Sequence, residues 1–229
     1  MLLVIDTSTR NAGAALARDG QVISSRSWRS TVNHTAELMP AVVQLLEAAR
    51  LGVNDLEGIA VALGPGGFSA LRVGMSVAKG LALATGKPLA GIGTLDAEAQ
   101  PFRQSGLPVC AMLDAGRGEV AAASFGPDGE RSGEDRICPP DELLAGLSSQ
   151  HIFCGEGTLS HTQLIKERLG NKAVVAGHSP AARLWALAEL GCLKLESGNA
   201  DDVATLQPYY LRMPTIGGPK RRDRVRQGS

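Results

Sequence analysis

The sequence predicts an α/β protein built from two tandem lobes, each a mixed β-sheet with flanking helices. Three strand-like segments open the chain and are followed by alternating helices and strands. The opening pattern then recurs 108 residues later, and a chain of 229 residues is long enough for one or two domains with buried cores. We expect a first lobe over residues 1–105, a second over 106–214 and a basic, disordered tail over 215–229.

The first lobe follows from hydrophobic patterning and turn residues. The strand-like segments cover residues 2–5, 13–17 and 21–28, and Asp19-Gly20 between the last two is a hairpin signal. We then expect a helix over 34–50, a strand over 59–63, a helix over 69–85 and a strand over 89–92. Gly86 and Pro88 end the second helix. Three antiparallel strands followed by this alternation indicate a mixed sheet with helices packed on it.

The second half repeats the first. Leu3-Val-Ile-Asp6 is echoed by Ala111-Met-Leu-Asp114, and the hairpin signal recurs at Asp128-Gly129. Further elements are predicted over 140–147, 151–154, 159–169 and 173–176, and a last helix begins with Ser179 as its N-cap. Two such lobes, each opening with a strand that ends in aspartate, follow the plan of the actin, sugar kinase and Hsp70 architecture, which is ribonuclease H-like.

Composition excludes several classes of protein. Lysine plus arginine equals aspartate plus glutamate at 23 each, and the basic run Lys220–Arg226 leaves 18 basic against 22 acidic residues elsewhere. The body is therefore mildly acidic and has no general nucleic-acid character. The four cysteines show no Cys-x-x-Cys pair, which predicts reduced, mostly buried thiols and a cytosolic protein. No signal peptide or membrane span is predicted.

The segment Gly64-Pro65-Gly66-Gly67 joins a strand to a helix. Glycines allow positive φ angles and let other groups approach the backbone closely. The segment lacks the Lys-Ser/Thr ending of a phosphate loop. We favour a backbone packing role, and an anion-binding nest is the alternative.

The first two helices carry a wide apolar surface. The first helix has its apolar residues over roughly 160° and the second over roughly 200° of the helical wheel. One sheet can cover only one side of such a layer, so we expect a docking surface for another subunit, with loops of the same chain as the alternative cover. The residues that we assign to this interface are His34, Leu38, Met39, Val42, Leu45, Leu71, Met75, Ala78 and Ala82.

Nucleotide binding is a second hypothesis. In the actin-like plan, the strand-end aspartates face the cleft between the lobes and can hold magnesium or its waters, while hydroxyls and turn amides receive phosphates. The candidate residues are Asp6, Thr7, Ser8, Thr9, Asp114 and Gly116. The alternative is that each aspartate caps a turn through local hydrogen bonds. Cys154-Gly155-Glu156-Gly157 is only a sparse version of the adenosine-binding turn of such ATPases, which weakens the nucleotide hypothesis.

Three motifs together resemble one family. Asp6-Thr7-Ser8-Thr9, the segment from Gly64 to Gly74, and Tyr210-Leu211-Arg212 are similar to those of the TsaB family, also called YeaZ. The resemblance covers the chain to about Pro214. It implies a non-catalytic, dimerising subunit of the bacterial machinery that makes threonylcarbamoyladenosine in tRNA. It also implies a heterodimer with the transferase TsaD through a four-helix bundle, recruitment of the ATPase TsaE, a homodimer in isolation, tRNA contact only within the complex, and no cofactor.

The same resemblance argues against a metal site. TsaD-like enzymes carry two histidines four residues apart after the strand that follows the second helix, and Thr94 and Glu98 stand at those positions here. His34 is assigned a capping or interface role, and neither a nucleophile elbow nor a catalytic triad can be assembled. An independent ATPase or phosphotransferase of the sugar-kinase kind remains the alternative function. The basic tail could contact tRNA phosphates.

Overall fold

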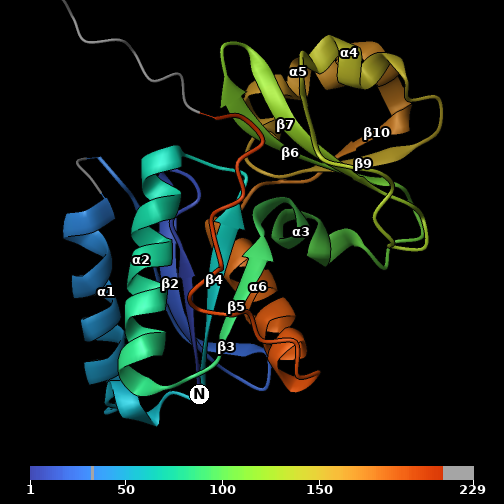
Figure 1. Ribbon diagram of the computed structural model, residues 1–229. Helices are drawn as coiled ribbons and strands as arrows, with labels where there is room; N and C mark the ends of the chain where they lie inside the picture. Colours follow the sequence, from blue (N-terminus) through green and yellow to red (C-terminus); the bar gives the residue numbers. More distant parts are fainter. Residues whose placement is uncertain (32–33, 214–229) are drawn as a thin grey trace, which may run out of the picture.

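The chain folds around two mixed β-sheets. The computed structural model describes residues 1–31 and 34–213, and within them each sheet has five strands (Figure 1). The first sheet has the order β3-β2-β1-β4-β5 and the second the order β10-β9-β6-β7-β8. In each sheet three consecutive strands are antiparallel neighbours, and two later strands join in parallel. The two sheets therefore share one topology, which confirms the predicted duplication and fold class.

The elements for which ranges were predicted fall close to them, whereas β8 and α3 had no predicted range. The strands are β1 (Leu2–Asp6), β2 (Asn11–Arg18), β3 (Gln21–Arg29), β4 (Gly58–Gly64), β5 (Leu89–Gly93), β6 (Val109–Gly116), β7 (Glu119–Phe125), β8 (Arg136–Cys138), β9 (His151–Cys154) and β10 (Ala173–Val175). The helices are α1 (His34–Ala48), α2 (Phe68–Thr85), α3 (Thr94–Ala99), α4 (Pro140–Ala145), α5 (Thr158–Leu169) and α6 (Pro180–Glu196). Gly86 has φ +67°, the left-handed conformation expected of a glycine that ends a helix.

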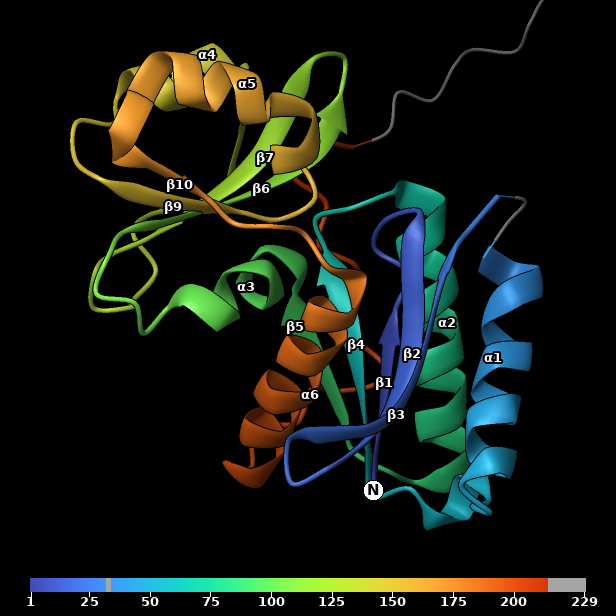
Figure 2. The same cartoon turned by 180° about the vertical axis from the view of Figure 1, so that it is seen from behind.

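The first sheet is covered on both faces. Successive side chains of a strand point to opposite faces, so Leu3 and Ile5 of β1 pack in the core under α1 and α2, whereas Leu2 and Val4 pack in the core under α6. Figure 2 shows α6 on the opposite side of this sheet from α1 and α2. All five residues of β1 are buried, which explains why this strand is apolar without alternation.

The second sheet is covered by α4 and α5 on one face and by α3 on the other. Leu143 and Ile165 fill the core under α4 and α5. Leu95 and Ala99 of α3 pack with Val109 and Phe125 of the second sheet. Because α3 also contacts α6 and the strands of the first sheet, it is the helix that joins the lobes.

The predicted second lobe, 106–214, is wrong in its last part. Helix α6 follows the second sheet in sequence but packs on the first, where Leu184 and Leu187 enter the core. The chain after α6 also stays with the first lobe as far as Tyr209. Asp201 bridges to Leu89 at the open edge of β5, and Tyr209 N donates to Leu63 O at 2.8 Å. Long-range packing of an apolar helix face therefore overrides the order of the sequence.

Other expectations have direct outcomes. Cys110, Cys138 and Cys154 are free and buried, and Cys192 is free and half-buried, as cysteine spacing predicted. Burial raises the pKa of the Cys110 thiol to about 12, so this thiol is unreactive at neutral pH. In the described residues no helix is long and apolar enough to span a membrane. The basic tail predicted over residues 215–229 lies outside the described residues.

Candidate functional site

A buried arginine lies against the end of β1. Arg183 comes from the first turn of α6, and its side chain is 0% exposed. Its Nε donates to Asp6 Oδ2 at 2.5 Å, and its Nη1 donates to Glu98 Oε1 at 2.8 Å. Asp6 ends β1 and Glu98 belongs to α3, so this one side chain ties α6 to the first sheet and to the helix between the lobes.

The same guanidinium reaches the second lobe. Its Nη2 donates to Asn11 O at 2.6 Å, at the start of β2, and to Thr9 Oγ1 at 3.1 Å, in the turn before β2. Glu156, on the turn between β9 and α5, has its Oε2 3.6 Å from Arg183 Nη1, and its Oε1 accepts a hydrogen bond from Asn11 Nδ2 at 2.8 Å. We call Arg183, Asp6, Glu98, Asn11 and Glu156 the arginine cluster.

The guanidinium of Arg183 remains protonated at this buried site. Burial lowers the pKa of its guanidinium, but the carboxylates of Asp6 and Glu98 outweigh burial, so the pKa is raised. The guanidinium therefore keeps its charge at any ordinary pH. Removing one partner of such a buried ion pair costs about 3–5 kcal/mol, because the remaining charge is left unpaired away from water.

The polar groups of the candidate phosphate-binding motif after β1 form hydrogen bonds within the chain. Asp6 Oδ1 accepts from Ser8 N at 2.9 Å and from Ser8 Oγ at 2.6 Å, while its Oδ2 accepts from Arg183. Thr7 Oγ1 donates to Ala70 O at 2.7 Å. Asp6, Thr7 and Ser8 are all buried. The turn-capping alternative is thus confirmed for Asp6.

The structure separates the six nucleotide candidates. Asp114 is exposed and accepts from Gly116 N at 2.6 Å, which confirms turn capping there too. Asp114 and Gly116 line a cavity of about 410 Å³ between the lobes, together with the Gly66-Gly67 turn. Thr9 lines a different cavity, of about 510 Å³. The six residues do not line one pocket, and nucleotide binding by them stays a prediction.

The two positions expected to lack a metal differ in their surroundings. Glu98 is paired with Arg183, and buried Thr94 Oγ1 has no hydrogen-bond partner among the described residues. His178 lies beside them, with Nδ1 3.7 Å from Glu98 Oε1. Within residues 1–31 and 34–213, no three His, Cys, Asp or Glu side chains are arranged to hold a metal ion. Of the two strand-end aspartates that a magnesium nucleotide would meet in this fold, Asp6 is bound to the Arg183 guanidinium and so does not fit that group, whereas Asp114 is exposed.

The glycine segment packs on neighbouring backbone, as predicted. A Cβ at Gly66 would lie 2.2 Å from Ser8 O, and Gly67 N donates to Ser8 O at 2.8 Å. Gly64 has φ +119°, and a Cβ there would lie 2.4 Å from Tyr209 O. Both positions therefore require glycine: Gly66 for close approach, and Gly64 for close approach and its backbone conformation.

The interface residues predicted on α1 and α2 need correction. Seven of them are buried in the core of the chain itself, because the helices direct their largest apolar residues at the first sheet. These seven are Leu38, Val42, Leu45, Leu71, Met75, Ala78 and Ala82. Met39 is exposed. His34 is half-buried beside Thr9, and burial lowers the pKa of its imidazole.

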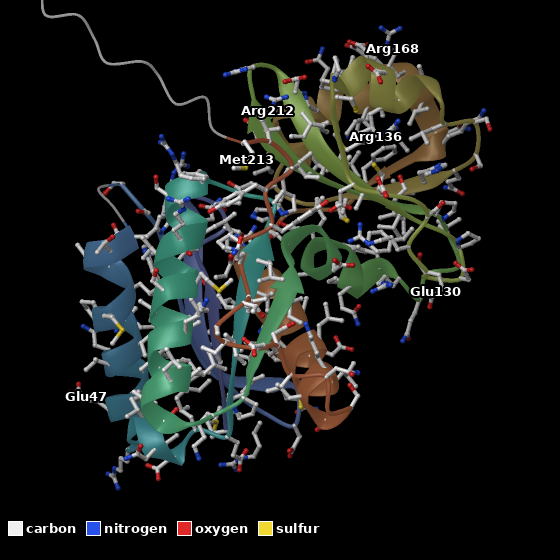
Figure 3. The ribbon with its side chains drawn as sticks, viewed as in Figure 1. Glu47, Glu130, Arg136, Arg168, Arg212 and Met213 are labelled. Atoms are coloured by element: carbon white, nitrogen blue, oxygen red, sulfur yellow. The ribbon has the colours of Figure 1, made fainter. Side chains whose placement is uncertain are left out.

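The outward side of the two helices is nevertheless poor in charge. We define the α1–α2 outer face by exposed Met39, Val43 and Gly80 and half-buried Val73 and Val77. Of the 14 exposed residues of these two fully described helices, only Glu47 and Arg72 are charged. Figure 3 shows Glu47 toward the C-terminal end of α1. Gly80 lies in the middle of α2, and a Cβ there would meet nothing within 4 Å.

The sequence motif near the end of the described chain links the lobes. The Tyr210 ring lies 4.8 Å from that of Phe68 at the start of α2, and the Tyr210 hydroxyl accepts from Arg72 Nε at 3.1 Å. Arg212 Nη2 donates to Glu119 Oε2 of β7 at 2.5 Å. The resemblance had singled out this motif without a role. The contacts give it one, as a strap from the first lobe to the second.

Comparison with known proteins finds a matching family model and related sequences. The family model described as TsaD, tRNA N6-adenosine threonylcarbamoyltransferase, matches residues 28–214. A tRNA threonylcarbamoyladenosine biosynthesis protein TsaB from Bacillus subtilis is 33% identical over 224 residues, which cover 93% of this chain and 94% of that protein. A tRNA N6-adenosine threonylcarbamoyltransferase from Anaeromyxobacter dehalogenans is 38% identical, but the match covers 42% of this chain and 33% of the transferase.

A solved structure agrees with the whole fold. YeaZ from Pseudomonas aeruginosa superposes with a TM-score of 0.75 at 28% identity, over 92% of this chain and 99% of that one. The likeness to TsaB and YeaZ thus extends over nearly the full chain, whereas the likeness to the transferase is partial.

Proposed function

This chain belongs to the TsaB family of tRNA threonylcarbamoyladenosine biosynthesis proteins, and from that membership we propose that it is a non-catalytic scaffold subunit for a TsaD-type transferase. Its part in the pathway would be to bind and activate the transferase, to help recruit a TsaE-type ATPase, and to meet tRNA only within the complex. It would form a homodimer when alone. Free cysteines suit the cytoplasm, where we propose that it works.

The partner follows from the relation between the two proteins. The family model of the transferase covers residues 28–214, a range that contains both α1 and α2. A TsaD-type partner therefore has an equivalent pair of helices, and equivalent surfaces on related chains can pair with approximate two-fold symmetry. We propose that the α1–α2 outer face packs on that pair as a four-helix bundle.

The chemistry of the α1–α2 outer face supports docking. Depletion of charge is typical of the central part of a protein interface. A glycine in a helix interior costs about 1 kcal/mol relative to alanine. Gly80 bears that cost with nothing of its own chain near it, which suits close approach by a second helix. This uncharged face around Gly80 is the observation on which the proposal rests.

The rival ATPase or phosphotransferase function has less support. It needs Asp6 free to face a magnesium nucleotide, but both carboxylate oxygens of Asp6 already accept hydrogen bonds within the chain. Asp114 remains exposed in the cavity between the lobes and is the residue on which that function would depend.

Reconstitution of tRNA modification tests the proposal. We expect a TsaD-type transferase with a TsaE-type ATPase and tRNA to form threonylcarbamoyladenosine at least about tenfold faster when this chain is added, an effect of about 1.4 kcal/mol on the barrier. Product is measured by mass spectrometry of nucleosides from the digested tRNA. No stimulation at any concentration of the chain would contradict the scaffold role.

The variant Asp114→Asn separates scaffold from catalyst. Because we assign no chemistry to Asp114, we expect the variant to stimulate the transferase within about twofold of the original chain, a difference of about 0.4 kcal/mol. A large loss of stimulation, with unchanged binding to the transferase, would instead favour the rival function.

A further inference from the structure

We infer that Arg183 is a built-in cation that takes the place of a bound metal nucleotide between the lobes, so that this chain holds its lobes together without any ligand. The inference concerns the arginine cluster and not the α1–α2 outer face. It rests on the hydrogen bonds and ion pairs of the guanidinium, on the origin of its partners and on the position of Glu156.

The guanidinium makes four hydrogen bonds and one further ion pair. Arginine has five N–H donors in a fixed planar fork. Nε donates to Asp6, Nη1 donates to Glu98 and faces Glu156, and Nη2 donates to both Thr9 and Asn11. Each nitrogen thus has acceptors at hydrogen-bond or ion-pair distance. Such a site is shaped for a planar cation and not for a spherical ion.

The partners come from four parts of the fold. Asp6 ends β1, Asn11 begins β2, Glu98 belongs to α3, and Glu156 belongs to the second lobe. Glu156 joins the two lobes, because one of its carboxylate oxygens contacts Asn11 and the other contacts Arg183. Asn11 belongs to the first sheet, and Arg183 belongs to α6, which packs on that sheet. The arginine cluster therefore links the two lobes.

The turn that presents Glu156 is itself fixed. Gly157 N donates to Met112 O at 2.9 Å, and a Cβ at Gly155 would lie 2.4 Å from that same oxygen. The turn therefore lies directly on β6, which holds the backbone of Glu156 against the second sheet. His178, with a side chain only 3% exposed, lies beside the ion pair, with its Nδ1 3.7 Å from Glu98 Oε1.

Chemical rescue tests this inference on the isolated chain. We expect Arg183→Ala to lower the thermal midpoint by roughly 10 °C, because it leaves buried carboxylates unpaired. Guanidinium chloride at about 20 mM should then recover a third or more of that shift, because it can bind the emptied site of the folded form. An equal concentration of sodium chloride is the control for ionic strength.

Leu187→Ala is the matched control. Leu187 is buried on the same helix, one turn further on, but it contacts apolar residues. This variant also creates a cavity, so its midpoint should fall, and guanidinium should not restore it. Equal responses of the two variants to guanidinium would overturn the inference, as would an Arg183→Ala midpoint equal to that of the original chain.

Two further measurements keep the test decisive if Arg183→Ala does not fold. Arg183→Lys retains the charge but has no planar fork, so its midpoint should fall below that of the original chain. Magnesium-ATP should leave the midpoint of the original chain unchanged. A lysine variant of full stability, or a rise of several degrees with magnesium-ATP, would overturn the inference. None of these assays contains tRNA or transferase, so their failure would leave the proposed scaffold role intact.

Discussion

Replacing Gly66 with alanine is expected to destabilise the folded chain by about 3 kcal/mol, the upper part of the range for overpacking a well-filled site. The new methyl group would lie 2.2 Å from Ser8 O and 2.9 Å from the Ser8 carbonyl carbon. These atoms are backbone and cannot rotate away as a flexible side chain would. Ser8 in turn donates to Asp6, so a shift of this backbone would also disturb the pairing of Asp6 with Arg183.

Urea unfolding of Gly66→Ala and Gly80→Ala measures this effect against a matched control. The same substitution at Gly80 adds a methyl group in open space within a helix, so it should stabilise the isolated chain by about 0.5–1 kcal/mol. The two variants should therefore move the midpoint in opposite directions. A Gly66→Ala variant as stable as the original chain would contradict the packing role of the Gly64–Gly67 segment.

Replacing Val43 with arginine is expected to weaken binding to a TsaD-type transferase by about 100-fold, or about 2.7 kcal/mol. Val43 is 43% exposed on the α1–α2 outer face, so the free chain should tolerate arginine there. In the complex the guanidinium would be buried in an uncharged helix–helix contact without a carboxylate to pair with. Such an unpaired buried charge is costly.

Isothermal titration calorimetry with the transferase measures that loss. Val174→Arg is the control, because Val174 is 40% exposed on β10. This strand belongs to the second sheet, whereas α1 and α2 pack on the first. It should bind as the original chain does. Thermal midpoints of both free variants should stay near that of the original chain. Equal affinity of the Val43 and Val174 variants would show that α1 is not in the contact.

Much of the fold could be predicted because its signals are local. The Asp19-Gly20 hairpin, the strand ending at Asp6 and its echo at Asp114 are short patterns, and they correctly gave two duplicated mixed sheets. The place of α6 could not be predicted in this way. An apolar helix face fits either sheet, and only the packed structure decides between them.

The candidate site was harder to predict for the same reason. The apolar width of α1 and α2 indicated more surface than one sheet covers, but periodicity cannot tell Val42, which is buried, from its exposed neighbour Val43. Arg183 carries little local signal. Its partners Asp6 and Glu98 are 177 and 85 residues away, so its role depends entirely on the tertiary fold. A lone arginine among the apolar residues of a predicted helix was the one available hint.

Hydrogen–deuterium exchange of the chain, alone and mixed with a TsaD-type transferase, tests the central claim most directly. Exchange reports opening of backbone hydrogen bonds, which slows where a partner covers a helix. The scaffold account predicts slower exchange in peptides from α1 and α2, and unchanged exchange in α4 and α5. Protection confined to the second lobe, with α1 and α2 exchanging as they do in the free chain, would contradict it.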